Sequence, residues 1–189
     1  MTRHIVVADY ISIDAVAEDP VGMEGSGLGD WTGPFTRGPL GDRFKHQELV
    51  GSGAVLLGRT TYDAFAAVWP GVKDETGFAA HLNRIPKFVV SNSLEHAAWK
   101  NTTIISGDVI EKVRALKEQP GGDILVYGSI SLVHSLARAD LVDAYNLMVF
   151  PVVLGRGKRV FADGQRDRFR LLAAQQFGDG IMMLQYARS

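Results

Sequence analysis

The chain has 189 residues, of which 46% are hydrophobic and 22% charged, with a formal net charge of −1. This is an ordinary globular composition, and the near-zero charge argues against partners such as nucleic acid or membranes that bind by bulk electrostatic attraction. Zero cysteines exclude disulfides and thiolate ligands, and the five histidines fall at no metal-ligand spacing, so no metal is predicted. We expect one cytoplasmic domain over residues 1–189, because the first apolar run, Ile5 to Ala8, is too short to cross a membrane.

Short β-rich runs alternate with helical patterns through most of the chain. The predicted strands cover residues 4–13, 54–57, 87–90, 102–105 and 124–127. Helices are predicted over 41–50, after the capping box formed by Asp108 and Glu111, and after Ser129, where Leu132, Val133 and Leu136 share one face. Such alternation predicts an α/β fold with a mostly parallel central sheet and helices on both faces.

The C-terminal part of the chain has a different pattern. Residues 142–149, 170–177 and 181–187 are strand-like runs without helices between them, and Gly178-Asp179-Gly180 has the composition of a hairpin turn. We therefore expect an antiparallel C-terminal hairpin at the edge of the sheet.

Glycine and hydroxyl residues follow two of the predicted strands, where open sheets of this kind bind ligands. At the first junction, Gly58 is followed by Arg59, and Thr60 or Thr61 could cap a helix whose free N–H groups form an anion site. Arg59 adds a bidentate donor suited to a phosphate monoester, such as the 2′-phosphate that distinguishes NADPH from NADH. The alternative is a plain capped helix with a surface arginine.

The second junction is Gly128-Ser129-Ile130, where the serine hydroxyl could cap a second helix. Glycine would let a pyrophosphate approach the backbone, and the helix N-terminus would neutralise it. An ordinary turn between strand and helix is the alternative. At a third junction, Ser91-Asn92-Ser93 could bond a ribose or phosphate, although turn chemistry explains these residues equally well. Two glycine turns in one sheet favour a dinucleotide.

These motifs resemble the dihydrofolate reductase superfamily, in the branch of the RibD C-terminal reductase domain of riboflavin biosynthesis and its stand-alone relatives. The matching segments are Ser12-Ile13-Asp14, residues 57–62, residues 86–91, Gly128-Ser129, Leu141-Val142-Asp143, residues 151–158 and Phe161. The resemblance implies a dihydrofolate reductase-like fold, a homodimer, and an NADPH site at the three turns described above. We expect the late apolar strands to form the dimer contact.

The resemblance also implies a reductase that transfers hydride from NADPH to a small heterocyclic (pteridine- or pyrimidine-like) or carbonyl substrate. Asp42, sixteen positions before Gly58, is placed like the substrate-binding acid of dihydrofolate reductases, and Asp14 lies where the first strand opens into the groove, so either could assist catalysis. The alternatives are a solvated helix acid and a loop cap. Residues 22–39 form either a lid over the substrate or a surface insertion. A non-catalytic nucleotide-binding or interaction module that kept the fold is the competing function.

Overall fold

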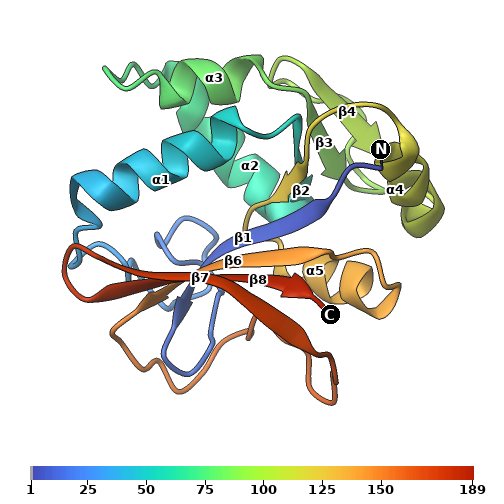
Figure 1. Cartoon of the computed structure of the whole chain (residues 1–189). Coiled ribbons are helices and arrows are strands. Elements are labelled where there is room, and N and C mark those ends of the chain that lie inside the picture. The colour runs from blue at the N-terminus through green and yellow to red at the C-terminus, as the bar shows by residue number, and fades with distance from the viewer. Residues whose placement is uncertain (1) are drawn as a thin grey trace.

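An eight-stranded sheet in the order β4-β3-β2-β5-β1-β6-β8-β7 runs through the computed structural model, which describes residues 2–189 (Figure 1). The strands are β1 (Ile5–Ser12), β2 (Ala54–Gly58), β3 (Lys87–Val90), β4 (Thr102–Ile105), β5 (Ile124–Val126), β6 (Ala144–Phe150), β7 (Phe169–Phe177) and β8 (Ile181–Arg188). All neighbours among β1 to β6 pair in parallel, whereas β8 is antiparallel to both β6 and β7. The predicted parallel sheet with an antiparallel C-terminal hairpin is confirmed.

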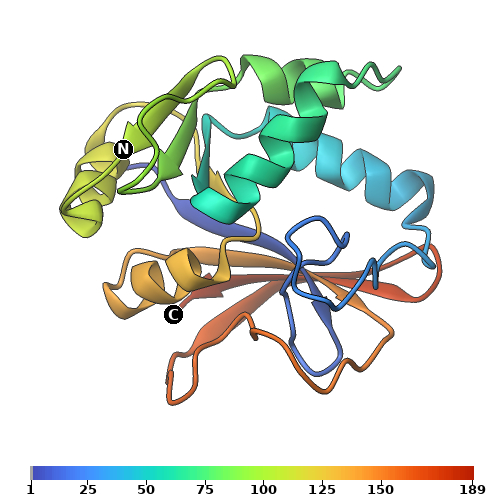
Figure 2. The same cartoon turned by 180° about the vertical axis from the view of Figure 1, so that it is seen from behind.

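Helices cover both faces of this sheet, as the two opposite views show (Figures 1 and 2). They are α1 (Gly38–Val50), α2 (Arg59–Val68), α3 (Phe78–Arg84), α4 (Val109–Glu118) and α5 (Ile130–Arg138), with a short 3-10 turn at Trp69–Gly71. The first three pack on one face through Leu49, Tyr62 and Leu82, and the last two on the other face through residues such as Val113 and Leu136. None of the helices in residues 2–189 is long and apolar enough to span a bilayer.

Strand β1 lies at the centre of the sheet because its side chains are apolar on both faces. Val6 and Ala8 belong to the core beneath α1 to α3, while Ile5, Val7 and Ile11 belong to the core beneath α4 and α5. This alternation is the two-residue period of a strand, and burial on both faces is typical of a central parallel strand.

The structure corrects one helix start expected from the sequence and confirms another. Helix α1 begins at Gly38 and not at Gly41, because Pro39 lies in its first turn, where the missing N–H costs no hydrogen bond. The capping box before α4 is confirmed, since the Asp108 carboxylate accepts a hydrogen bond from the Glu111 amide at 3.2 Å.

The long connection between β1 and α1, residues 13–37, is anchored to the sheet at its C-terminal half. Trp31 is 6% exposed and its ring lies 5.8 Å from that of Phe150, against which Phe35 also packs. The preceding stretch contains four glycines with positive φ, namely Gly22, Gly25, Gly27 and Gly29. The connection therefore joins a glycine-rich loop to a packed aromatic anchor.

Candidate functional site

The turns that follow β2 and β5 are joined to each other by hydrogen bonds. The Gly58 amide donates to the Ser129 hydroxyl at 2.7 Å, and the Ser129 amide donates to the Thr61 hydroxyl at 3.1 Å. Since β2 and β5 are parallel neighbours, both turns emerge at the carboxyl edge of the sheet. Helices α2 and α5 thus begin side by side.

The turn after β5 has an unusual backbone conformation. Gly128 (φ 53°) and Ser129 (φ 60°) are both left-handed, a region that costs a non-glycine residue free energy and is often found at functional sites. A Cβ atom on Gly128 would lie 3.0 Å from the Thr61 hydroxyl and 3.1 Å from its methyl group. Glycine is required here because the neighbouring turn approaches so closely.

The hydroxyl caps predicted for the two helices are wrong. Gly58 occupies the N-cap position of α2, and neither Thr60 nor Thr61 caps this helix through its side chain. Ser129 is the N-cap residue of α5, but its hydroxyl accepts from Gly58 and donates to the carbonyl oxygen of Tyr127 at 3.0 Å. The hydroxyls join the two turns to each other, and the first N–H groups of both helices have no acceptor within their own helix.

A groove of about 320 Å³ opens over these helix N-termini. Its lining consists of Ala17, Glu18, Pro20, Glu24, Ser26, Gly58, Arg59, Thr60, Thr61, Gly128, Ser129, Ile130, Ser131, Leu132 and Lys158. It thus brings together seven predicted cofactor-binding residues, the ones at the first two junctions. Two helix N-termini and two basic side chains make this part of the groove suited to anions.

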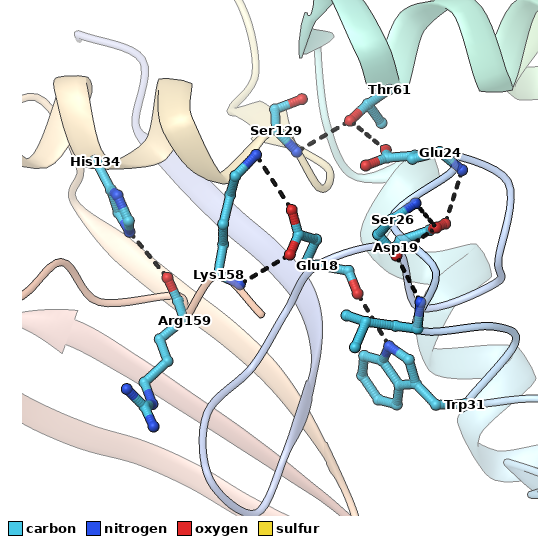
Figure 3. A network of polar contacts seen from close by, with 11 residues as sticks. Glu18, Asp19, Glu24, Ser26, Trp31, Thr61, Ser129, His134, Lys158 and Arg159 are labelled. Carbon is cyan, nitrogen blue, oxygen red and sulfur yellow. Dashed lines mark hydrogen bonds and ion pairs between the residues drawn. The ribbon is translucent and has the colours of Figure 1, made fainter. Parts of the chain in front are cut away.

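Carboxylates from the β1–α1 connection form the opposite wall of the groove (Figure 3). Glu24 accepts a hydrogen bond from the Thr61 hydroxyl at 2.7 Å, while Glu18 pairs with the Lys158 ammonium at 3.2 Å. Burial raises the pKa of Glu24, an effect that the hydrogen bond from Thr61 opposes. Asp19 holds the loop in shape by accepting from the Glu24 and Ser26 amides at 2.8 and 3.0 Å. The groove is therefore positive at the helix ends and negative along the loop.

A buried carboxyl group lies directly behind the β5–α5 turn. Asp9 of β1 is 4% exposed, and its Oδ1 accepts from the Gly128 amide at 2.5 Å. Its Oδ2 has no hydrogen-bond partner among residues 2–189, and burial raises its pKa to about 8 despite the Gly128 hydrogen bond. Asp9 was not predicted as a site residue, although a charged residue inside an apolar strand is costly to bury and is itself a signal.

The third predicted junction lies apart from this groove. Ser91 accepts hydrogen bonds from the Ser93 and Leu94 amides, and Asn92 accepts from the Gly107 amide at 2.9 Å. These contacts match the turn-chemistry alternative, and none of Ser91, Asn92 and Ser93 is among the described residues that line the groove. Their role in cofactor binding stays a prediction.

The two candidate catalytic carboxylates also lie outside the groove lining. Asp14 accepts from the Ser12 hydroxyl at 2.6 Å and from the Leu154 and Gly155 amides, and these hydrogen bonds, that of Ser12 foremost, lower its pKa to about 2. A carboxyl group held ionised in this way is a poor proton donor at neutral pH. Asp42 is exposed and pairs with Arg37 at 2.8 Å. Both assignments remain predictions.

A second cavity, of about 310 Å³, lies between α1 and the sheet. In its wall the side-chain amide of Asn146 donates to the Glu48 carboxylate at 2.8 Å, and the side-chain amide of Gln185 donates to the side-chain oxygen of Asn146 at 3.2 Å. Ser52 and Asp123, which precede β2 and β5, also contribute to the lining. The cavity thus reaches the amino ends of these strands, whereas the groove lies at their carboxyl ends.

The family model described as the RibD C-terminal domain matches residues 3–183. The uncharacterized protein YyaP of Bacillus subtilis (strain 168) is 30% identical over 136 residues, which cover 70% of this chain and 72% of YyaP.

Two solved structures show the same fold over the whole chain. A structure described as a riboflavin biosynthesis protein from Shewanella sp. PV-4 has a TM-score of 0.73 at 18% identity. Dihydrofolate reductase from Enterococcus faecalis, complexed with NADP(H) and RAB-propyl, has a TM-score of 0.63 at 12% identity. Each comparison covers 100% of this chain and 99% of the other. The dihydrofolate reductase-like fold expected from the sequence is confirmed.

Proposed function

Because the chain belongs to the RibD C-terminal domain family, we propose that it is a reductase that binds NADPH in the groove over α2 and α5. The observation that carries this proposal is the pairing of two strand–glycine–helix turns at one edge of the sheet. A dinucleotide has two phosphate-bearing parts, and each helix N-terminus can bind one of them. The E. faecalis enzyme with the same fold is complexed with NADP(H), which supports the choice of ligand.

The residues of the groove fit a phosphate-bearing dinucleotide. The Cβ atom that Gly128 lacks would meet the Thr61 side chain, so glycine at this position lets the two turns pack against each other. The first-turn amides of α5 can donate to a pyrophosphate. Arg59 begins α2, and its Nε contacts Asp63 at 2.7 Å, which leaves the terminal nitrogens of its guanidinium for a phosphate monoester. Arg59 is the residue that would select NADPH over NADH.

Bound NADPH would supply a hydride, so the protein has to orient the substrate, exclude water and assist proton transfer. The glycine-rich loop with Glu18 and Glu24 borders the groove and could cover bound ligand. We propose a small unsaturated heterocycle or carbonyl compound as the substrate.

A titration with NADPH and, separately, NADH tests this function. Tryptophan quenching and energy transfer to the reduced nicotinamide report binding, and Arg59→Ala is compared with Arg114→Ala, a matched removal of an exposed arginine that pairs with Glu111 on α4. We expect micromolar NADPH binding, weaker NADH binding, and loss of the preference in Arg59→Ala alone.

If neither nucleotide binds, the reductase proposal fails. If NADPH binds and its absorbance stays constant over a broad panel of heterocyclic and carbonyl substrates, the non-catalytic nucleotide-binding module is the better description. Retention of the NADPH preference in Arg59→Ala would show that another residue reads the 2′-phosphate.

A further inference from the structure

Asp9 holds the peptide that forms the floor of the groove. Its short hydrogen bond directs the Gly128 N–H inward, toward the core, and not toward a ligand in the groove. The neighbouring Ser129 amide is likewise bonded to Thr61, so the first free amides of the turn belong to α5 itself. The carboxyl group therefore fixes the orientation of the β5–α5 turn from behind.

The surroundings of Asp9 favour its neutral form. It lies on the same face of β1 as Val7 and Ile11, which belong to the apolar core beneath α4 and α5. Burial raises its pKa to about 8. Among the charged groups that act on it, Lys45 of α1 favours ionisation, while Glu48 of α1 and Glu24 of the loop oppose it. Tyr127, directly after β5, and Tyr145 of β6 also face this region, and burial keeps both phenols neutral by raising their pKa values.

An ionised Asp9 would place a negative charge directly beneath the turn that is proposed to contact a pyrophosphate. A buried carboxylate behind the turn and a phosphate in front of it repel each other with little screening. A bound dinucleotide would thus favour the protonated carboxyl group, and by linkage the protonated carboxyl group would favour the bound dinucleotide.

We propose that Asp9 is a positioning residue for the β5–α5 turn and that its proton is linked to the binding of the anionic cofactor in the groove. This inference rests on the proposed NADPH site. The neutral carboxyl group accepts from Gly128 without adding charge, whereas the carboxylate keeps the hydrogen bond but repels the phosphates. Cofactor affinity should therefore fall as the pH rises through about 8.

The size of the effect follows from linkage. If bound NADPH raises the pKa of Asp9 by about one unit, the dissociation constant increases roughly fivefold between pH 7 and pH 9. At pH 9 the free protein is then about ten parts ionised to one protonated, while the complex is about half ionised. Asp9→Asn keeps a carbonyl oxygen that can accept from Gly128 and has no proton to lose, so its affinity should be constant over this range.

Two measurements test the inference. The first is the NADPH dissociation constant of the wild type and of Asp9→Asn at pH 7, 8 and 9. The second, without cofactor, is thermal unfolding of both proteins between pH 5 and pH 8. Across this interval Asp9 keeps its proton in the folded protein, whereas the same carboxyl group is ionised in the unfolded chain. The wild type should therefore lose stability as the pH rises, and Asp9→Asn should lose less.

The outcomes separate this inference from the proposed function. NADPH binding that is equal at pH 7 and pH 9 in the wild type overturns the linkage and leaves the cofactor site intact. The same pH dependence in Asp9→Asn also overturns it, and would point to Lys87, whose pKa burial lowers to about 8 at the amino end of β3. Absence of NADPH binding at pH 7 overturns the proposed function itself. If Asp9→Asn does not fold, a flat wild-type profile still refutes the linkage.

Discussion

Replacing Ser129 with alanine should uncouple the two turns that form the groove. The Ser129 hydroxyl is the acceptor for the Gly58 amide at 2.7 Å and the donor to the Tyr127 carbonyl at 3.0 Å, and Tyr127 is 7% exposed. Alanine leaves both backbone groups without this partner. At about 1 kcal/mol for each partly buried group, the free energy of unfolding should fall by about 2 kcal/mol. For a domain of this length, that corresponds to a decrease of roughly 4–8 °C in Tm.

Thermal unfolding followed by circular dichroism measures this change, with Ser135→Ala as the matched control. Ser135 is in the same helix and donates to the Ser131 carbonyl at 3.0 Å, on a solvated side of α5 where water can replace the hydroxyl. Its replacement should change the free energy of unfolding by less than about 0.5 kcal/mol. Equal melting temperatures for Ser129→Ala and Ser135→Ala would refute the argument that this hydroxyl joins the turns.

Three further results are expected. Gly128→Ala should weaken NADPH binding at least about tenfold, because the new methyl group meets Thr61 at 3.0 Å in a left-handed turn and so displaces the turn that borders the groove. An unchanged dissociation constant would contradict the close approach of the β2–α2 and β5–α5 turns at this position. In acid unfolding, Asp14→Asn should lose less stability than the wild type between about pH 4 and pH 2. The Asp14 carboxylate stabilises the fold at pH values above the pKa that it has in the unfolded chain, and this stabilisation is lost as the pH falls through its folded-state pKa of about 2. We propose that the homodimer implied by the family resemblance dissociates in the double variant Leu171→Glu, Leu172→Glu, because both leucines of β7 are 51% exposed. Light scattering that reports the same mass for wild type and variant would exclude this strand as the contact.

The fold was predictable from sequence because it depends on patterns that local rules describe. Strand β1 is almost continuously apolar, the Asp108 capping box opens α4, and Gly178 to Gly180 close the terminal hairpin. The start of α1 was less accessible, since Gly38 and Pro39 follow a glycine-rich loop and are typical both of a turn and of a first helical turn.

The turns of the groove were predictable for a similar reason, whereas its loop side was not. Glycine after a buried strand indicates a place where another group approaches the backbone closely. Gly58 is approached in this way by Ser129, and Gly128 by Thr61. Glu24 and Lys158 reach the groove from segments more than a hundred residues apart in the chain, so no spacing rule connects them. The predicted caps failed because the hydroxyls bond across the two turns, a long-range contact that competes with local capping.

Asp9 illustrates how a departure from a pattern can carry more functional information than the pattern. Strand β1 is buried almost throughout, and burying a carboxyl group in it costs free energy that an apolar residue at this position would not cost. The Asp9 carboxyl group is hydrogen-bonded to the backbone of Gly128, in the turn where Ser129 adopts a left-handed conformation that is costly for a non-glycine residue. Burial of an acid and backbone strain both cost stability, and both occur at the point where the groove requires a fixed peptide orientation. The fold is therefore less stable at the place where the proposed cofactor contact needs a rigid backbone. Asp9→Asn relieves this cost and should be more stable than the wild type at alkaline pH. The cofactor titrations of the same variant show whether binding has lost its dependence on a proton.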